Sequence, residues 1–152
     1  MTSGIRQVLY VPVVLGKGAV LPVYANPGDA GADLTAAIEK PVVLYPCDRR
    51  AIGTGVSCAI PEGYELQVRP RSGLALKYGI SVLNAPGTVD SGYRGEIRVI
   101  LINTDLHRAF TVEPGMRIAQ AVIAPVTYAR FVPVGTLEDS VRGAEGFGSS
   151  GV

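Results

Sequence analysis

The sequence predicts an all-β fold, a jelly-roll-like β-barrel or sandwich, on three observations. Tyr64–Arg69 alternates apolar and polar residues with period two, which is the pattern of a half-buried strand. Further short apolar runs are separated by turns that carry many of the chain's 19 glycines and 11 prolines. No strands alternate with helices at the spacing that a parallel sheet requires. With 152 residues, the chain is long enough for one domain with its own core.

The first part of the chain contains four runs that we expect to be strands. Residues 8–14 precede a glycine-containing turn, residues 32–38 follow a glycine, and residues 42–45 lie between two prolines. Residues 51–60 carry β-branched side chains and end at a further proline. Because Gly and Pro punctuate short apolar runs of this kind, each run is typical of a strand.

The middle of the chain combines three strands with the only expected helix. Tyr64–Arg69 is the alternating strand, and residues 79–83 and Glu96–Asn103 are apolar runs of strand length. Ser72–Tyr78 is a helix of about two turns, and the Ser72 hydroxyl is expected to cap its N-terminus.

The last part of the chain changes character after three more expected strands, at residues 109–112, 116–126 and 131–134. From residue 138 onward the chain is rich in glycine and has few large apolar side chains. Such a segment cannot hold itself in a core, because glycine loses the most backbone entropy and buries nothing. We therefore expect a β-barrel domain over residues 1–137 and a flexible C-terminal arm over residues 138–152.

Charge and composition exclude some function classes. Lys and Arg number 14 and Asp and Glu 13, for a net charge of +1, whereas nucleic-acid-binding domains carry a clear basic excess. Charged residues make up 18% of the chain, below the roughly 25% of soluble domains. Either surface is buried against partners, or the exterior is unusually apolar.

The cysteines and the N-terminus indicate a cytoplasmic protein with no membrane partner. Cys47 and Cys58 have no CxxC spacing and no nearby histidine, so neither a zinc site nor a disulfide framework is indicated. The apolar run near the N-terminus is broken by Pro12 and ended by Lys17, which argues against a secretory signal. No stretch approaches the roughly 18 apolar residues of a membrane span.

The usual catalytic motifs are absent from the sequence. His107 is the only histidine and lies in a charged turn, where a solvated loop residue is the simplest interpretation. There is no Gly-x-Ser-x-Gly elbow, and the Gly16-Lys17 pair is followed by Gly18 rather than by the Ser or Thr of a phosphate-binding loop.

Three polar features are candidates for a site. Asp33 and Asp90 stand in small or apolar surroundings, although either could be a turn residue that bonds its own backbone. Residues 69–73 combine two arginines with a hydroxyl at a helix start, which suits an anion, unless they form a solvated basic turn. Residues 84–97 look like a hairpin with Tyr93 at its polar tip, and the open backbone of such a hairpin could read one edge of a heterocycle.

Five ordered segments resemble the motifs of the homotrimeric deoxyuridine triphosphate nucleotidohydrolases, the dUTPases. One segment alone would be a weak signal, but five in order, at spacings set by intervening strands, are specific. They span nearly the whole chain and comprise residues 30–34, 69–75, 84–97, 115–120 and 142–151.

The resemblance implies a homotrimer with three active sites, each built from three subunits, in which the arm of one chain closes over a site of its neighbours. The implied reaction is the Mg²⁺-assisted hydrolysis of dUTP to dUMP and pyrophosphate, which keeps uracil out of DNA and supplies dUMP for dTMP synthesis. No direct protein ligand to the metal is expected, because Mg²⁺ often keeps its waters and is carried by substrate phosphates.

The resemblance also assigns roles around the nucleoside. Asp90 is implied as the general base that activates the attacking water. Tyr93 is implied to pack under the deoxyribose and leave no room for a 2'-hydroxyl. Asn84 and the main chain of the same segment, including Thr88 and Val89, are implied to read the uracil edge.

Around the phosphates, the resemblance implies that Asp33 orders either water near Mg²⁺ or an arginine of the site. In the tail, Phe147 is implied to stack on uracil. The remaining residues expected to bind substrate are Arg71, Ser72, Gly73 and Gln120 in the body and Arg142, Gly148, Ser149 and Ser150 in the tail.

Two tail residues depart from the family pattern, since Glu145 stands where glycine is usual and Ser150 where threonine is common. Serine keeps the hydroxyl, whereas Glu145 adds a negative charge near a triphosphate. Two alternatives remain beside dUTP hydrolysis: a dCTP deaminase, which resembles dUTPases in fold, and a non-catalytic nucleotide-sensing trimer.

Overall fold

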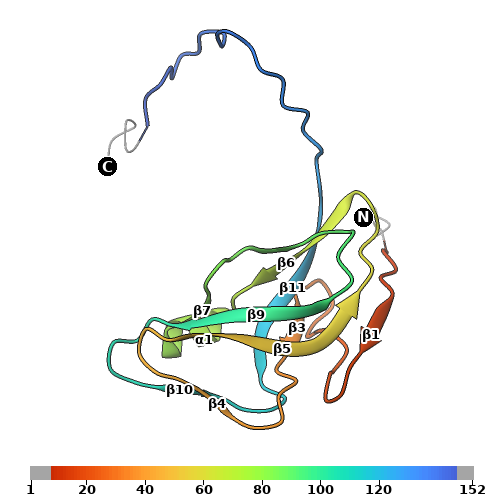
Figure 1. The fold of residues 1–152 in the computed structure, drawn as a ribbon, viewed down its shortest axis with the longest axis vertical. Helices are drawn as coiled ribbons and strands as arrows, with labels where there is room; N and C mark the ends of the chain where they lie inside the picture. The colour runs from red at the N-terminus through yellow and green to blue at the C-terminus, as the bar shows by residue number, and fades with distance from the viewer. Residues whose placement is uncertain (1–7, 147–152) are drawn as a thin grey trace.

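The computed structural model describes residues 8–146 and has a body of antiparallel strands in three sheets (Figure 1). The first sheet has the order β1 (Val13–Leu15), β5 (Arg49–Cys58), β9 (Glu96–Asn103), β7 (Ile80–Val82). The second has the order β2 (Val23–Tyr24), β3 (Ala32–Thr35), β11 (Arg117–Pro125), β6 (Tyr64–Arg69), β8 (Gly87–Val89). The third pairs β10 (Phe110–Val112) with β4 (Val42–Leu44), and α1 (Ser72–Tyr78) is the one short helix of the described chain. The all-β, jelly-roll-like fold is thus confirmed.

One hydrophobic core lies between the two larger sheets. Alternate residues of β5 and β9 point into it, as their burial alternates along each strand. The largest buried apolar side chains are Leu34, Leu44, Ile80, Ile97, Leu101, Ile118, Val56, Val99 and Val112. Two buried polar side chains are satisfied: Thr54 Oγ1 donates to the Ile97 carbonyl at 2.6 Å, and Asn103 Nδ2 donates to the Leu44 carbonyl at 3.0 Å.

The strands with regular alternation were predicted with their observed ends. Tyr64–Arg69 and Glu96–Asn103 match β6 and β9, and the helix matches α1. The strand expected over residues 8–14 is shorter and begins at Val13, directly after Pro12, whose nitrogen has no hydrogen to donate to a ladder. The short edge strand β2, which pairs with β3, was not predicted.

The predicted hairpin over residues 84–97 is wrong. Its first arm, β8, pairs with β6, whereas its second arm, β9, pairs with β5 and β7 in the other sheet. The segment therefore crosses from one sheet to the other at an edge of the barrel. An alternating pattern shows that two runs are strands but does not show which partners they pair with.

The expected Ser72 cap is also wrong. The N-cap of α1 is Arg71, with extended φ and ψ of −91° and 127° and no side-chain capping bond. Ser72 is already the first helical residue. At the other end Gly79 adopts φ 65°, and its N–H bonds to the carbonyls of Ala75 and Leu74.

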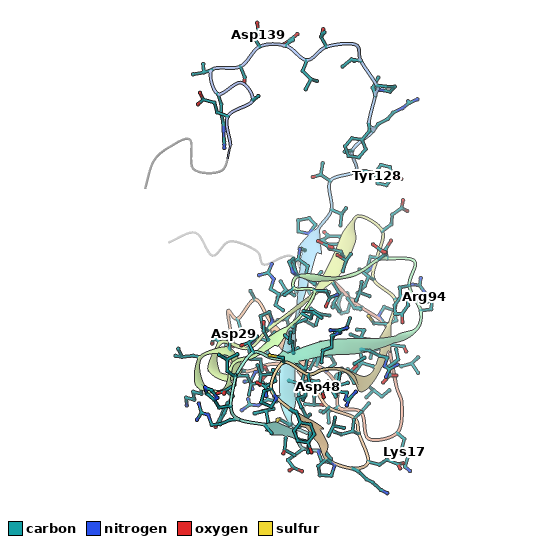
Figure 2. All side chains as sticks on the ribbon, turned by 60° about the vertical axis from the view of Figure 1, so that its left-hand side comes forward. Lys17, Asp29, Asp48, Arg94, Tyr128 and Asp139 are labelled. Carbon is teal, nitrogen blue, oxygen red and sulfur yellow. The ribbon has the colours of Figure 1, made fainter. Side chains whose placement is uncertain are left out.

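A long exposed segment follows β11. From residue 126 to residue 146 the chain has no strand or helix, and it leaves the body in an arc (Figure 1). The side chains of Tyr128 and Asp139 stand clear of the barrel in Figure 2. The strand expected at residues 131–134 does not form, because no strand in the described part of the chain lies beside it to pair with it. The exposed segment begins ahead of residue 138, where the sequence suggested the start of the arm.

No helix among residues 8–146 is long and apolar enough to cross a membrane.

Candidate active site

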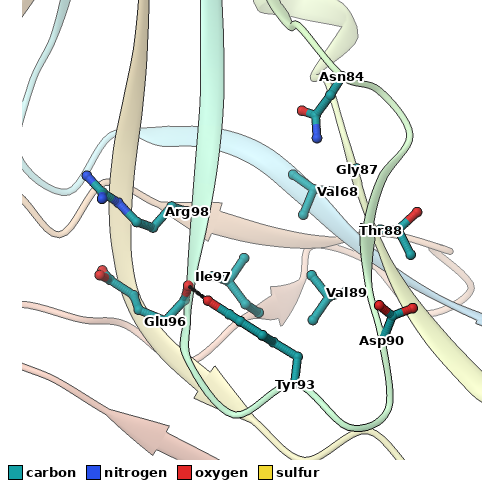
Figure 3. A pocket seen from close by; sticks show the side chains of 10 residues that line it. All are labelled: Val68, Asn84, Gly87, Thr88, Val89, Asp90, Tyr93, Glu96, Ile97 and Arg98. Carbon is teal, nitrogen blue, oxygen red and sulfur yellow. Dashed lines mark hydrogen bonds between the residues drawn. The ribbon is translucent and has the colours of Figure 1, made fainter.

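A pocket of about 220 Å³ lies between β8 and the start of β9 (Figure 3). It gathers the residues of the body to which the resemblance assigned the nucleoside and the attacking water. The lining consists of Val68, Asn84, Gly87, Thr88, Val89, Asp90, Tyr93, Glu96, Ile97 and Arg98. Val68, Val89 and Ile97 are buried, whereas Asp90 and Tyr93 are exposed. Apolar walls with a few convergent polar groups suit a flat heterocycle joined to a polar chain.

The turn after β8 holds Asp90 and Tyr93 next to each other. The main-chain N–H of Tyr93 donates to the Asp90 carbonyl at 3.0 Å and closes the turn. Arg94 also stabilises this turn, since its Nη1 donates to the carbonyls of Ser91 at 2.6 Å and Tyr93 at 2.8 Å. The Tyr93 hydroxyl donates to the Glu96 carbonyl at 3.0 Å. The carboxylate and the ring are therefore placed by one hydrogen-bonded loop.

The free edge of β8 supplies main-chain groups to the pocket. β8 is the last strand of its sheet and pairs only with β6 in the described chain. At Gly87 an added Cβ would lie 3.3 Å from both Asn84 Nδ2 and Val68 Cβ. The absence of a side chain there lets the Asn84 amide approach the strand. An unpaired edge with an amide beside it can donate to and accept from one edge of a base.

A second cluster forms around Asp33 in β3. Asp33 Oδ2 accepts a hydrogen bond from Arg117 Nη1 at 3.2 Å, and Arg71 Nε lies 3.1 Å from Oδ1. The Arg71 contact is an ion pair without hydrogen-bond alignment, so the buried Oδ1 has no hydrogen-bond partner. Arg71 Nη1 also donates to the Arg117 carbonyl at 3.3 Å. Two guanidiniums share one carboxylate, which leaves excess positive charge for an anion.

The other body residues assigned to phosphates lie near this cluster. Strand register pairs Gln120 with Asp33 on one side and Arg69 on the other. A Cβ at Gly31 would lie 3.1 Å from Gln120 Cβ, so the glutamine side chain packs over that glycine. Ser72 and Gly73 follow Arg71 directly and are exposed in the first turn of α1.

Arg142, the one arm residue of the predicted site that the structure describes, is apart from both clusters. Arg142 lies in the exposed segment, where its Nε donates to the Glu145 carbonyl at 2.9 Å. Glu145 is exposed as well. The other tail residues of the predicted site, Phe147, Gly148, Ser149 and Ser150, lie outside the described residues.

The pocket and the Asp33 cluster do not meet within one chain. None of Asp33, Arg71 and Gln120 lines the pocket. Val89, just before Asp90, pairs with Leu66 on β6, whereas Arg71 lies five residues further along the chain, beyond the end of that strand.

Three charged residues of these clusters were not assigned a role from the sequence. Arg117 lay inside a quoted motif, but its pairing with Asp33 depends on strand register. Glu96 and Arg98 line the pocket from the start of β9. The sequence shows that both lie on the polar face of the expected strand, but it does not show that the pocket lies on this face.

Two ionisable groups outside these clusters have shifted pKa values. The main-chain N–H groups of His107 and Arg108 donate to the Asp105 carboxylate and lower its pKa. His107 is an exposed loop residue, as predicted. Burial raises the pKa of the Cys58 thiol, against a smaller opposing effect of Arg94. Cys47 and Cys58 are both free, as the sequence indicated.

Asp90 is the carboxylate of these clusters that a metal ion could approach. Residues 8–146 contain no group of three His, Cys, Asp or Glu side chains that could hold an ion. The most enclosed carboxylate of the clusters, Asp33, faces two arginines. Asp90 is exposed beside the pocket and could contact a metal-bound water.

Comparison with known proteins places these features in one family. A family model described as dUTPase matches residues 17–151. Deoxyuridine 5'-triphosphate nucleotidohydrolase of Leifsonia xyli subsp. xyli is 57% identical over 141 residues, 93% of this chain and 90% of that protein. The protein of the same name from Chlamydia pneumoniae is 59% identical over 138 residues, 90% of this chain and 94% of that one. A solved structure of Staphylococcus bacteriophage 80alpha dUTPase with dUPNHPP is 31% identical with a TM-score of 0.85, covering 95% of this chain and all of that chain.

Proposed function

This chain belongs to the dUTPase family, and from that premise we propose that Asp90 activates the water that cleaves dUTP into dUMP and pyrophosphate. The chain is a dUTP diphosphatase. The observation that carries the proposed mechanism is the pocket beside β8, which places Asp90, Tyr93 and Asn84 on one surface. dUMP formation would keep uracil out of DNA and supply the precursor of dTMP.

The nucleoside would lie in the pocket. Asn84 and the free edge of β8 at Thr88 and Val89 would bind the edge of uracil, and the buried apolar walls would contact its faces. Tyr93 would lie under the deoxyribose, where its ring fills the space that a 2'-hydroxyl needs. This placement is supported by the hydrogen bond from the Tyr93 hydroxyl to the Glu96 carbonyl, which limits the movement of the ring.

Asp90 is the proposed general base. Its carboxylate is exposed at the end of β8 and lines the same pocket, so a water between it and the α-phosphate is within reach. A carboxylate alone is a weak base toward water. Most of the rate enhancement would therefore come from in-line positioning and from neutralisation of phosphate charge.

The phosphates would be held by Arg71, Ser72, Gly73 and Gln120, with Asp33 orienting Arg71. This role of Asp33 is supported by its ion pair with Arg71 and its hydrogen bond to Arg117. When bound with the nucleotide, Mg²⁺ would neutralise phosphate charge and help to orient the triphosphate. The proposed grip on the terminal phosphate by Arg142, Ser149 and Ser150, with Phe147 on uracil, completes the site.

We further propose that the active unit is a homotrimer whose sites combine residues from different subunits. The separation between the pocket and the Asp33 cluster within one chain supports this arrangement. The exposed segment after β11 also supports it, since Tyr128 is 96% and Phe131 93% exposed, and such apolar surface is normally covered by a partner. The arm of one chain would close over a site of its neighbours and exclude water. The cytoplasmic location stays a prediction.

Pyrophosphate release from dUTP, dCTP, dTTP and UTP, measured with Mg²⁺ in one assay, tests the proposal. We expect release from dUTP far above that from the other three. Ammonia release from dCTP would favour a deaminase, and binding of dUTP without pyrophosphate release would favour a nucleotide sensor. Either result would overturn the proposed reaction.

A further inference from the structure

The start of β9 is fastened to an irregular part of β5. The β5–β9 ladder shifts register between Gly53 and Ser57, and Gly55 within this bulge has φ 65°. The bulge is itself held from two sides. Gly53 O accepts the N–H of Ala37 at 2.9 Å, and Gly55 O accepts the N–H of Gly16 at 2.7 Å. It is therefore a fixed support rather than a loose loop.

Glu96, the first residue of β9, attaches to this support through its side chain. Glu96 Oε1 accepts the N–H of Gly55 at 2.8 Å. A Cβ on Gly53 would lie 2.6 Å from the same oxygen, so a side chain at position 53 would displace the carboxylate from this place. At the next residue, the buried Thr54 hydroxyl donates to the Ile97 carbonyl at 2.6 Å. The bulge thus positions two successive residues of β9.

The main chain of Glu96 contacts Tyr93. Its carbonyl accepts the Tyr93 hydroxyl at 3.0 Å, and Figure 3 shows the ring reaching across the pocket to this carbonyl. A Cβ on Gly95 would overlap the Tyr93 hydroxyl, so the ring packs directly on the Gly95 backbone. The position of the ring consequently depends on where β9 begins.

We propose that Glu96 is a positioning residue for sugar selection: its carboxylate fixes the start of β9 on the β5 bulge, so that its carbonyl holds Tyr93 against the sugar. This inference rests on the proposed function, in which Tyr93 excludes a 2'-hydroxyl. Without the carboxylate, the Gly55 N–H loses its acceptor and the carbonyl that holds the ring is free to shift. Discrimination against ribose then falls, while Asp90 and the phosphate-binding residues stay in place.

The test compares kcat and KM for dUTP and UTP in the full-length chain. Glu96→Ala removes the acceptor, Glu96→Gln keeps a side-chain oxygen, and Tyr93→Phe removes the hydroxyl that the carbonyl holds. Tyr93→Ala gives the selectivity of a site without the ring. Glu62→Ala is the matched control, because Glu62 is an exposed glutamate outside both clusters.

We expect Glu96→Ala to lower the ratio of kcat/KM for dUTP to that for UTP at least about fivefold, the scale of one hydrogen bond. Tyr93→Phe should lower this ratio by a similar factor, and combining Glu96→Ala with Tyr93→Phe should lower it little further. Glu96→Gln and Glu62→Ala should each change the ratio less than about twofold. An unchanged ratio in Glu96→Ala, or equal losses on both nucleotides, would overturn the inference, as would Glu96→Gln behaving like Glu96→Ala. If Glu96→Ala does not fold, an unchanged ratio in Tyr93→Phe has the same meaning. Wild-type protein that fails to cleave dUTP would instead refute the proposed function.

Discussion

An exposed ion pair provides a comparison for the two more enclosed ion pairs of Asp33, so that the contribution of the Asp33 cluster to stability can be measured. Lys17 and Glu39 form the shorter pair, with Nζ and Oε1 2.7 Å apart and side chains 88% and 75% exposed. Asp33 lies 3.1 Å and 3.2 Å from its two arginines, but its own side chain is only 10% exposed. Because water and salt screen an exposed pair far more than an enclosed one, the longer contacts should contribute more.

The expected magnitudes follow from exposure. Glu39→Gln should lower the free energy of unfolding by at most about 0.5 kcal/mol, as is usual for a surface pair. Removing one partner of a fully buried pair costs about 3–5 kcal/mol. Here Arg71 and Arg117 are 27% and 57% exposed, so water can solvate them in part. We therefore expect a loss of about 1–3 kcal/mol for Asp33→Asn.

Urea denaturation of both variants beside wild type provides the measurement. All samples need the same chain concentration, because the stability of an assembly depends on it. Turnover of dUTP should fall in Asp33→Asn and stay unchanged in Glu39→Gln. Equal destabilisation by the two substitutions, or a loss below about 0.5 kcal/mol in Asp33→Asn, would contradict the argument from burial.

Three further changes test the catalytic base, the arm and an acid-sensitive turn. Asp90→Asn should lower kcat by at least about 100-fold with dUTP still bound in calorimetry, and a near-normal kcat would remove Asp90 from the base role. Deletion of residues 141–152 should leave a folded assembly in size-exclusion chromatography that releases pyrophosphate poorly, whereas full activity would deny the arm a role. Asp105 has a lowered pKa in the folded chain, so its charge stabilises the fold above the unfolded-state pKa, and this contribution is lost as pH falls through the folded value. Asp105→Asn should therefore have a lower Tm than wild type at neutral pH, with the gap closing as pH falls through the lowered pKa of Asp105, and a gap independent of pH would contradict this assignment.

The parts of the fold that sequence predicts well are those decided by local pattern. β6 and β9 alternate along their length and have one buried face each, so their ends could be read directly. Residues 131–134 carry equally apolar side chains, but a strand also needs a partner, and none of the strands among residues 8–146 pairs with them. The pairing of β8 with β6 rather than β9 is likewise a long-range choice that no local pattern contains.

The candidate site divides in the same way. Asp90 and Tyr93 stand three positions apart, and the turn that joins them is local, so one segment predicted their proximity. Arg117 and Asp33 are brought together by antiparallel pairing of β11 with β3. The position of the Glu96 side chain depends on a bulge in β5, and the role of the glycines in this bulge can be recognised only once the pairing register of β5 and β9 is known.

The separate positions of the pocket and the Asp33 cluster in one chain have a genetic consequence. Suppose that each site joins the pocket of one subunit to the Asp33 cluster of another. An Asp90→Asn chain then has a defective pocket and an intact cluster, whereas an Arg71→Ala chain has an intact pocket and a defective cluster. In randomly mixed assemblies, a site has an intact pocket half of the time and an intact neighbouring cluster half of the time, so about a quarter of sites would be whole. Two inactive alleles expressed in one cell would then complement each other, whereas one allele with both changes would rescue neither.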